Sequence, residues 1–106
     1  MFVFPVKALY LVGDGDADAP LQAGVTASSR TFKKAVDRNR VKRVMREAYR
    51  LQKLPLQNAL KDTDQSVIIF FIYVGKELPV FAEVYEKMGI ILGRLSDTII
   101  KKTGKG

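Results

Sequence analysis

The chain has 106 residues, a net charge of +7 and 47% hydrophobic residues, and it contains no cysteine and no histidine. This length and composition support one folded domain with a single core, spanning residues 1–106. Because cysteine and histidine are missing, disulfides, thiolate zinc sites and the commonest general base are excluded, and a self-sufficient enzyme would have to rely on carboxylates, lysine or tyrosine.

The first part of the chain predicts a β-hairpin. Residues 2–12 are rich in β-branched and aromatic side chains, and Phe4, Val6, Ala8 and Tyr10 fall on one face of the expected strand. Residues 13–20 contain only glycine, aspartate, alanine and a final proline, which is typical of a turn, and residues 21–28 alternate again. We therefore expect two neighbouring strands joined by this loop. Its aspartates resemble the start of a calcium-binding loop, but the required glycine and closing glutamate are absent, so a solvated loop is the better interpretation.

A helical period replaces the alternation from about Lys33. The helix should end before Pro55, which cannot donate a backbone hydrogen bond and restricts the residue before it. Residues 56–61 are expected to add a short helical turn, and residues 62–64 to form a loop.

The last part of the chain predicts a strand and a long helix. Residues 67–74 are eight consecutive apolar residues, which indicate a strand buried on both faces. This run is far shorter than the roughly 20 residues that cross a bilayer. A helix of about 20 residues should follow Pro79 at its first position, with residues 101–106 as a frayed tail. Its core face is expected to consist of Phe81, Val84, Met88, Ile91, Leu92, Leu95 and Ile99. Since residues 1–11 also lack the features of a signal peptide, we expect a cytoplasmic protein with no membrane partner.

The positive charge is concentrated in one quarter of the chain. Residues 30–53 contain ten basic and two acidic residues, whereas the rest of the chain contains eight basic and nine acidic residues. With a helical period, the apolar residues Val41, Val44, Met45 and Ala48 form one narrow stripe that should face the core. The remaining face of the helix carries Arg38, Asn39, Arg40, Lys42, Arg43, Arg46 and Arg50.

This cationic face predicts a polyanionic partner. Like charges recur every four residues along it, and their repulsion destabilises an isolated helix unless something external offsets it. Phosphates would do so, and the predominance of arginine favours bidentate phosphate contacts. A solvated basic face, an anionic membrane and calmodulin are alternatives. The apolar stripe is narrow and lacks Trp and Phe, so it is better explained by packing within a core.

The dense part of this segment resembles the signature of the bacterial ribonuclease P protein family. The resemblance rests on Phe32-Lys33-Lys34-Ala35-Val36-Asp37-Arg38-Asn39-Arg40-Val41-Lys42-Arg43, followed by Arg46-Glu47-Ala48-Tyr49-Arg50. It implies an α+β fold, a two-layer α/β sandwich with a mixed sheet and a left-handed βαβ crossover to the basic helix, as in the second domain of ribosomal protein S5. Members of the family usually begin with a further basic helix, which has no counterpart before Met1, and many have glycine where this chain has Lys33.

The resemblance also implies a division of labour within a ribonucleoprotein enzyme. A catalytic RNA subunit, with Mg²⁺ in the RNA-containing holoenzyme, removes the 5′ leader of precursor tRNA, and the protein is expected to carry no catalytic residue and to bind no metal or cofactor of its own. By position, the RNA-binding residues would be Arg30, Lys34, Arg38, Asn39, Arg40, Lys42, Arg43, Arg46 and Arg50. Tyr10 would contact the leader in a cleft that Thr26 and Ser28 also face. No obligate protein partner is evident.

Two other function classes stay open. A ribosomal or other structural RNA-binding protein would share the basic helix without needing Arg38-Asn39-Arg40 at this spacing. A self-sufficient metal-dependent nuclease is the least favoured class, because its carboxylates would have to converge and the only dense acidic group lies in the loop at residues 13–20.

Overall fold

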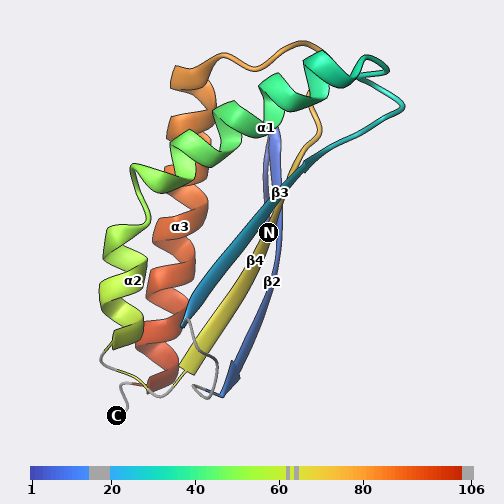
Figure 1. Ribbon diagram of the computed structural model, residues 1–106. Coiled ribbons are helices and arrows are strands. Elements are labelled where there is room, and N and C mark those ends of the chain that lie inside the picture. Colours follow the sequence, from blue (N-terminus) through green and yellow to red (C-terminus); the bar gives the residue numbers. More distant parts are fainter. Residues whose placement is uncertain (15–19, 62, 64, 104–106) are drawn as a thin grey trace.

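The computed structural model describes residues 1–14, 20–61, 63 and 65–103. Within these residues, four strands form one mixed sheet and three helices lie on one side of it, which makes an α+β fold (Figure 1). The elements are β1 (Phe2–Val3), β2 (Val6–Asp14), β3 (Leu21–Ala27), α1 (Ala35–Arg50), α2 (Leu54–Lys61), β4 (Gln65–Tyr73) and α3 (Phe81–Thr103).

The order of the strands is β1-β2-β4-β3, so the predicted hairpin between β2 and β3 is wrong. β4 lies between them, antiparallel to β2 and parallel to β3. The physical reason is that β4 is the most apolar strand, and the central place satisfies its backbone on both sides while its alternate side chains Val67, Ile69 and Phe71 are buried. The crossover from β3 to β4 runs through α1 and α2, as expected from the family resemblance; its left hand and the likeness to ribosomal protein S5 stay predictions.

The first predicted strand is two strands. A turn at Phe4-Pro5, whose peptide bond is cis, separates β1 from β2 and brings the two antiparallel. The amino group of Met1 donates to the carbonyl oxygen of Ala8 at 2.9 Å, and the Ala8 amide donates back to Met1 at 2.8 Å. Phe4 therefore lies exposed in the turn instead of sharing the buried face of Val6 and Ala8.

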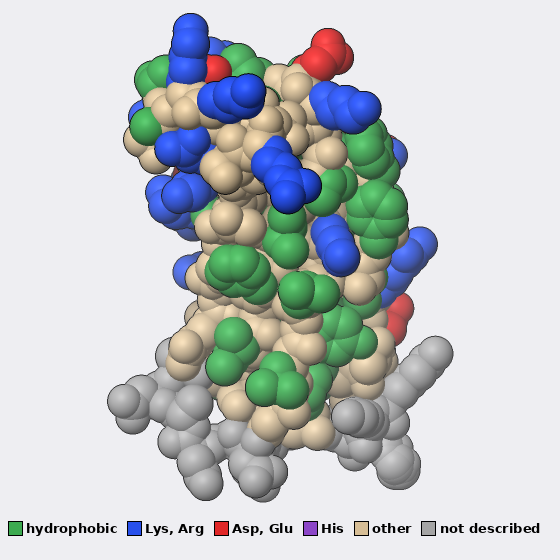
Figure 2. Space-filling model, turned by 90° about the vertical axis from the view of Figure 1, so that its right-hand side faces the viewer, with side chains coloured by type: hydrophobic (Ala, Val, Ile, Leu, Met, Phe, Trp, Pro, Cys, Tyr) green, Lys and Arg blue, Asp and Glu red, His purple; other side chains and the backbone are tan. Residues whose placement is uncertain are grey.

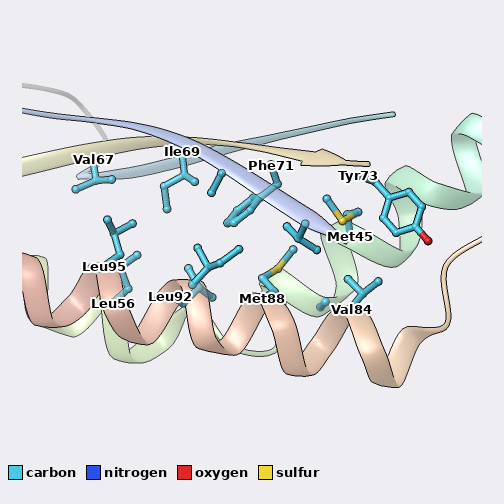
Figure 3. Packing of buried hydrophobic residues seen from close by; sticks show 14 of the residues in the cluster. Met45, Leu56, Val67, Ile69, Phe71, Tyr73, Val84, Met88, Leu92 and Leu95 are labelled. Atoms are coloured by element: carbon cyan, nitrogen blue, oxygen red, sulfur yellow. The ribbon is translucent and has the colours of Figure 1, made fainter. Parts of the chain in front are cut away.

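The core lies between the sheet and the helices. Alternate side chains of β4 point into it, including Val67, Ile69 and Phe71, and meet Met88 and Leu95 of α3 (Figure 3). The predicted core face of the last helix is confirmed except at Phe81, which is 39% exposed. The intervening side chains of β4 are not buried: Ile68 is 51% exposed and Phe70 44%. The prediction of a strand buried on both faces is therefore wrong, because no helix of the described chain covers the second face.

The helix boundaries differ from the prediction around Pro55. α1 ends at Arg50, and Pro55 lies in the first turn of α2, where its missing N–H has no intrahelical partner to lose. Gln52 joins this corner to α3, since its Nε2 donates to the carbonyl oxygens of Ala48 at 3.1 Å and Tyr85 at 2.8 Å. At the end of the chain, residues 101–103 are helical, whereas residues 104–106 lie outside the described residues, as do Asp62 and Asp64 of the predicted loop.

Candidate RNA-binding surface

The orientation of α1 is set by its narrow apolar stripe. Val41, Met45 and Ala48 are fully buried, and Val44 packs partly buried against the same core, which confirms the predicted phase of the helix. α1 contacts both α3 and β3, so its buried side is committed to the fold. The opposite side is therefore fixed toward solvent along the whole helix.

Four cations of α1 form what we call the basic surface: Arg40, Lys42, Arg43 and Arg46. Asn39 is exposed among them, and only Lys42 is partly buried. The ion pairs found in the described residues join Arg50 to Glu47 and Lys87 to Glu86, so no cation of the basic surface has an acidic partner there. The four charges consequently repel one another without internal compensation, as the sequence predicted.

Arg50 differs from these four cations. Its Nη2 and Nε donate to the two carboxylate oxygens of Glu47 at 2.6 Å and 3.0 Å, one turn back along the helix. The guanidinium holds the pKa of the Glu47 carboxyl below its usual range, mainly through this hydrogen bond. At neutral pH the pair is therefore neutral overall. Glu47 and Arg50 are three residues apart in a helix, and this spacing alone already favours an ion pair between them.

Arg38 is also engaged within the chain. Its Nη1 donates to the carbonyl oxygens of Phe32 at 2.8 Å and Lys33 at 3.0 Å, both just ahead of α1. Arg30 and Lys34 are exposed on the same connection. The predicted RNA-binding residues are thus contiguous, but two of their guanidinium groups, those of Arg38 and Arg50, already have partners.

The face of the sheet turned away from the helices carries exposed hydrophobic side chains. We call it the outer apolar face, and it consists of Phe2, Leu9, Leu11, Ile68 and Phe70. Figure 2 shows hydrophobic side chains gathered on this side of the molecule, with Lys and Arg side chains clustered above them. A Cβ atom at Gly24 would lie 2.9 Å from the ring of Phe70, so the absence of a side chain lets this ring lie close against β3. The continuous apolar run of residues 67–74 does not by itself reveal which of its side chains are exposed.

The residues predicted to line the leader cleft do not all lie on one face of the sheet. Tyr10 pairs with the buried Ile69, whereas Thr26 pairs with Ile72, so these two side chains project from opposite faces of the sheet. The prediction that they share one cleft, which relied on the alternation along the strands, is wrong, because the register with β4 places them on opposite faces. Ser28 follows β3, and its Oγ accepts the Arg30 N–H at 3.2 Å. Thr26 lies on the same side of the sheet as the outer apolar face.

The described part of the chain contains no group of three or more acidic side chains arranged to hold a metal ion. Asp16 and Asp18 of the acidic loop lie outside the described residues. Among the helices that the structure describes, none has the length and hydrophobicity that crossing a membrane requires.

Comparisons with known proteins point to one family. The family model described as Ribonuclease P matches residues 4–96. Two proteins named ribonuclease P protein component, from two strains of Porphyromonas gingivalis, are each 36% identical over 97 residues, which is 92% of this chain and 71% of each relative. A protein of the same name from Chlorobaculum tepidum is 43% identical over 58 residues, which is 51% of this chain and 38% of that relative. No solved structure gives a significant match. The chain belongs to the ribonuclease P protein family.

Proposed function

We propose that this chain is the RNA-binding protein subunit of ribonuclease P, which assists a catalytic RNA in removing the 5′ leader of precursor tRNA. The observation that carries the proposal is the basic surface of α1, whose cations have no acidic partner in the described residues and whose helix is anchored by buried Val41, Met45 and Ala48. Phosphates would replace the missing counterions. A purely structural RNA-binding role, the alternative left open by the sequence, has no observation of its own.

In this proposal the RNA subunit contacts the basic surface and the exposed side chains around it, Arg30, Lys34 and Asn39. Arg40, Arg43 and Arg46 present guanidinium groups, which bind phosphate through two parallel hydrogen bonds. The cleavage chemistry belongs to the RNA subunit, where we expect Mg²⁺ to be held in the holoenzyme. Such an assembly would act in the cytoplasm, where precursor tRNA is available.

We further propose that the 5′ leader lies on the outer apolar face. Unpaired bases stack on exposed aromatic rings, and Phe70 is held against β3 at Gly24 with 44% of its surface exposed. Thr26 lies on the same side of the sheet and can donate or accept a hydrogen bond there. The role of Tyr10 in leader binding stays a prediction that has to be tested separately, since it projects from the other face.

Reconstitution with a bacterial ribonuclease P RNA at low Mg²⁺ tests the first part. The triple variant Arg40→Ala, Arg43→Ala, Arg46→Ala should lose the stimulation of cleavage and flatten the salt dependence of binding by about two to three log units per log unit of salt. The matched control carries Lys61→Ala, Lys87→Ala and Arg94→Ala, which remove the same charge elsewhere. Equal losses in both variants would show that only net charge matters and would refute a specific surface.

Leader binding is tested with precursor tRNA and with mature tRNA that has no leader. Phe70→Ala should weaken binding of the precursor by about tenfold, within the range of one lost stacking contact, and leave mature tRNA binding unchanged. Leu54→Ala, another exposed hydrophobic side chain but on α2, is the control. If Phe70→Ala weakens both RNAs alike, or neither, the leader does not lie on this face.

A further inference from the structure

The start of α1 lacks the side chain that usually stabilises a helix N-terminus. Lys34 occupies the N-cap position with an extended backbone and makes no side-chain capping bond. Serine, threonine or aspartate at this position would accept a hydrogen bond from the first turn, which is typically worth about 1 kcal/mol. A lysine cannot accept one. Something else must therefore hold the chain in its path from β3 into α1.

Arg38 supplies this link from inside the helix. It lies one turn after Lys34, and its Nη1 reaches back to the carbonyl oxygens of Phe32 and Lys33 at 2.8 Å and 3.0 Å. A cation near a helix N-terminus is ordinarily unfavourable, because the helix dipole is positive there. Two carbonyl oxygens ahead of the helix offset this repulsion and give the guanidinium a defined position.

The same connection is fixed on its other side by Phe32. The Phe32 ring is buried and contacts Tyr73 at the end of β4, with ring centroids 6.0 Å apart. Its amide donates to the carbonyl oxygen of Ser28 at 3.0 Å. The backbone between β3 and α1 is thus held at Phe32 by packing and at the carbonyls of Phe32 and Lys33 by Arg38. This segment of backbone carries three exposed cations: Arg30, Lys33 and Lys34.

We infer that Arg38 is a positioning residue for RNA binding: it fixes the connection from β3 to α1 so that Lys33 and Lys34 are presented in register with the basic surface. The inference rests on the proposed function and gives Arg38 a mainly indirect role in RNA binding. The Nη1 atom is used by the two carbonyls, whereas Nη2 and Nε have no partner in the described residues and stay available to a phosphate. Most of the effect of Arg38 on affinity then comes through its neighbours, because a loose connection has to be ordered when RNA binds.

Arg38→Lys tests the inference because it keeps the charge and removes the planar fork. Affinity for ribonuclease P RNA should fall about tenfold, and the slope of log affinity against log salt should fall about as much as in Lys34→Ala, although residue 38 keeps its charge. Arg94→Lys, the same exchange at an exposed arginine of α3, is the matched control. Phe32→Leu loosens the same connection without touching any charge and should reproduce the loss. Circular dichroism must show unchanged helix content, and amide relaxation of residues 29–34 should report greater mobility in both variants.

A double-mutant cycle separates positioning from direct contact. Lys34→Ala should weaken binding in the wild-type background but have little further effect beside Arg38→Lys, since Lys34 is then no longer held in place. Additive losses, or wild-type affinity of Arg38→Lys, would overturn the inference. If Arg43→Ala also leaves affinity and salt slope unchanged, the proposed function fails as well. If Arg43→Ala weakens binding as expected while Arg38→Lys does not, only the positioning role is refuted.

Discussion

The ion pair between Arg50 and Glu47 makes a sharp prediction about the salt dependence of RNA binding. Arg43 has no acidic partner in the described residues, whereas Arg50 donates two hydrogen bonds to Glu47. Two arginines seven residues apart on the same helix should therefore contribute unequally. We expect Arg43→Ala to flatten the salt dependence more than Arg50→Ala, and Glu47→Gln to steepen it.

The magnitudes follow from counterion release. Each phosphate neutralised by the protein contributes about 0.7 to 0.9 to the slope of log affinity against log salt. Arg43→Ala should therefore reduce the slope by nearly one unit. Between 50 and 200 mM salt, one contact corresponds to about a threefold difference in affinity. Glu47→Gln frees the charge of Arg50 and should add up to one contact. An exposed ion pair of this kind contributes little to stability, so the fold should be unaffected.

The assay is equilibrium binding of each variant to ribonuclease P RNA over a series of salt concentrations. The double variant Glu47→Gln, Arg50→Ala is the control, since removing both members of a neutral pair should leave the slope close to that of the wild type. If Arg50→Ala flattens the slope as much as Arg43→Ala, and Glu47→Gln changes nothing, the ion pair does not neutralise Arg50 in solution.

Three further predictions concern stability. Phe71→Ala removes a fully buried ring from the middle of the core and should lower the free energy of unfolding in urea by about 3–5 kcal/mol; a loss below 1 kcal/mol would contradict the packing. Gly93→Ala should raise this free energy by about 1 kcal/mol, because a Cβ there meets nothing within 4 Å. Gly89→Ala should not raise the free energy of unfolding, because its Cβ would lie 2.5 Å from Oε1 of Gln52. Equal stabilisation by the two glycine substitutions would refute this contact. Burial raises the pKa of Tyr49 to about 12. Between pH 10 and 12 this tyrosine therefore ionises only in the unfolded state, and the free energy of unfolding falls. The expected loss is about 1 kcal/mol, a value that allows for the partial solvent exposure of the side chain. Tyr49→Phe should remove this part of the alkaline loss in urea unfolding at pH 9 and 11, and an unchanged loss would refute it.

The parts of the fold that depend on local spacing could be predicted from the sequence. The stripe of Val41, Met45 and Ala48 fixed the phase of α1, and the phase located the basic surface on its other side. The strand order could not be predicted in this way. Pairing of β3 with β4 depends on contacts between segments some 45 residues apart, and the sequence gives no local signal that β4 separates β2 from β3.

Within the candidate site, the sequence identified the charges but not their partners. A helical wheel treats Arg38, Arg43 and Arg50 as equivalent cations. The structure distinguishes them, because Arg38 bonds to backbone carbonyls ahead of the helix and Arg50 to a carboxylate, while Arg43 has neither kind of partner among the described residues. The bonds of Arg38 depend on the path of the connection from β3, which is set by the burial of Phe32 against Tyr73. Periodicity contains no information about that path.

The central position of β4 in the sheet also bears on the proposed binding of the leader. Because β3 is parallel to β4, both strands end at the same edge of the sheet, and the connection to α1 starts there. On the side of the molecule shown in Figure 2, Lys and Arg side chains cluster above the exposed hydrophobic side chains. The predicted hairpin would have placed β3 directly beside β2, without β4 between them. On β4, Ile68 and Phe70 stay exposed, and in the proposed function they offer apolar surface on which unpaired bases of the leader can stack.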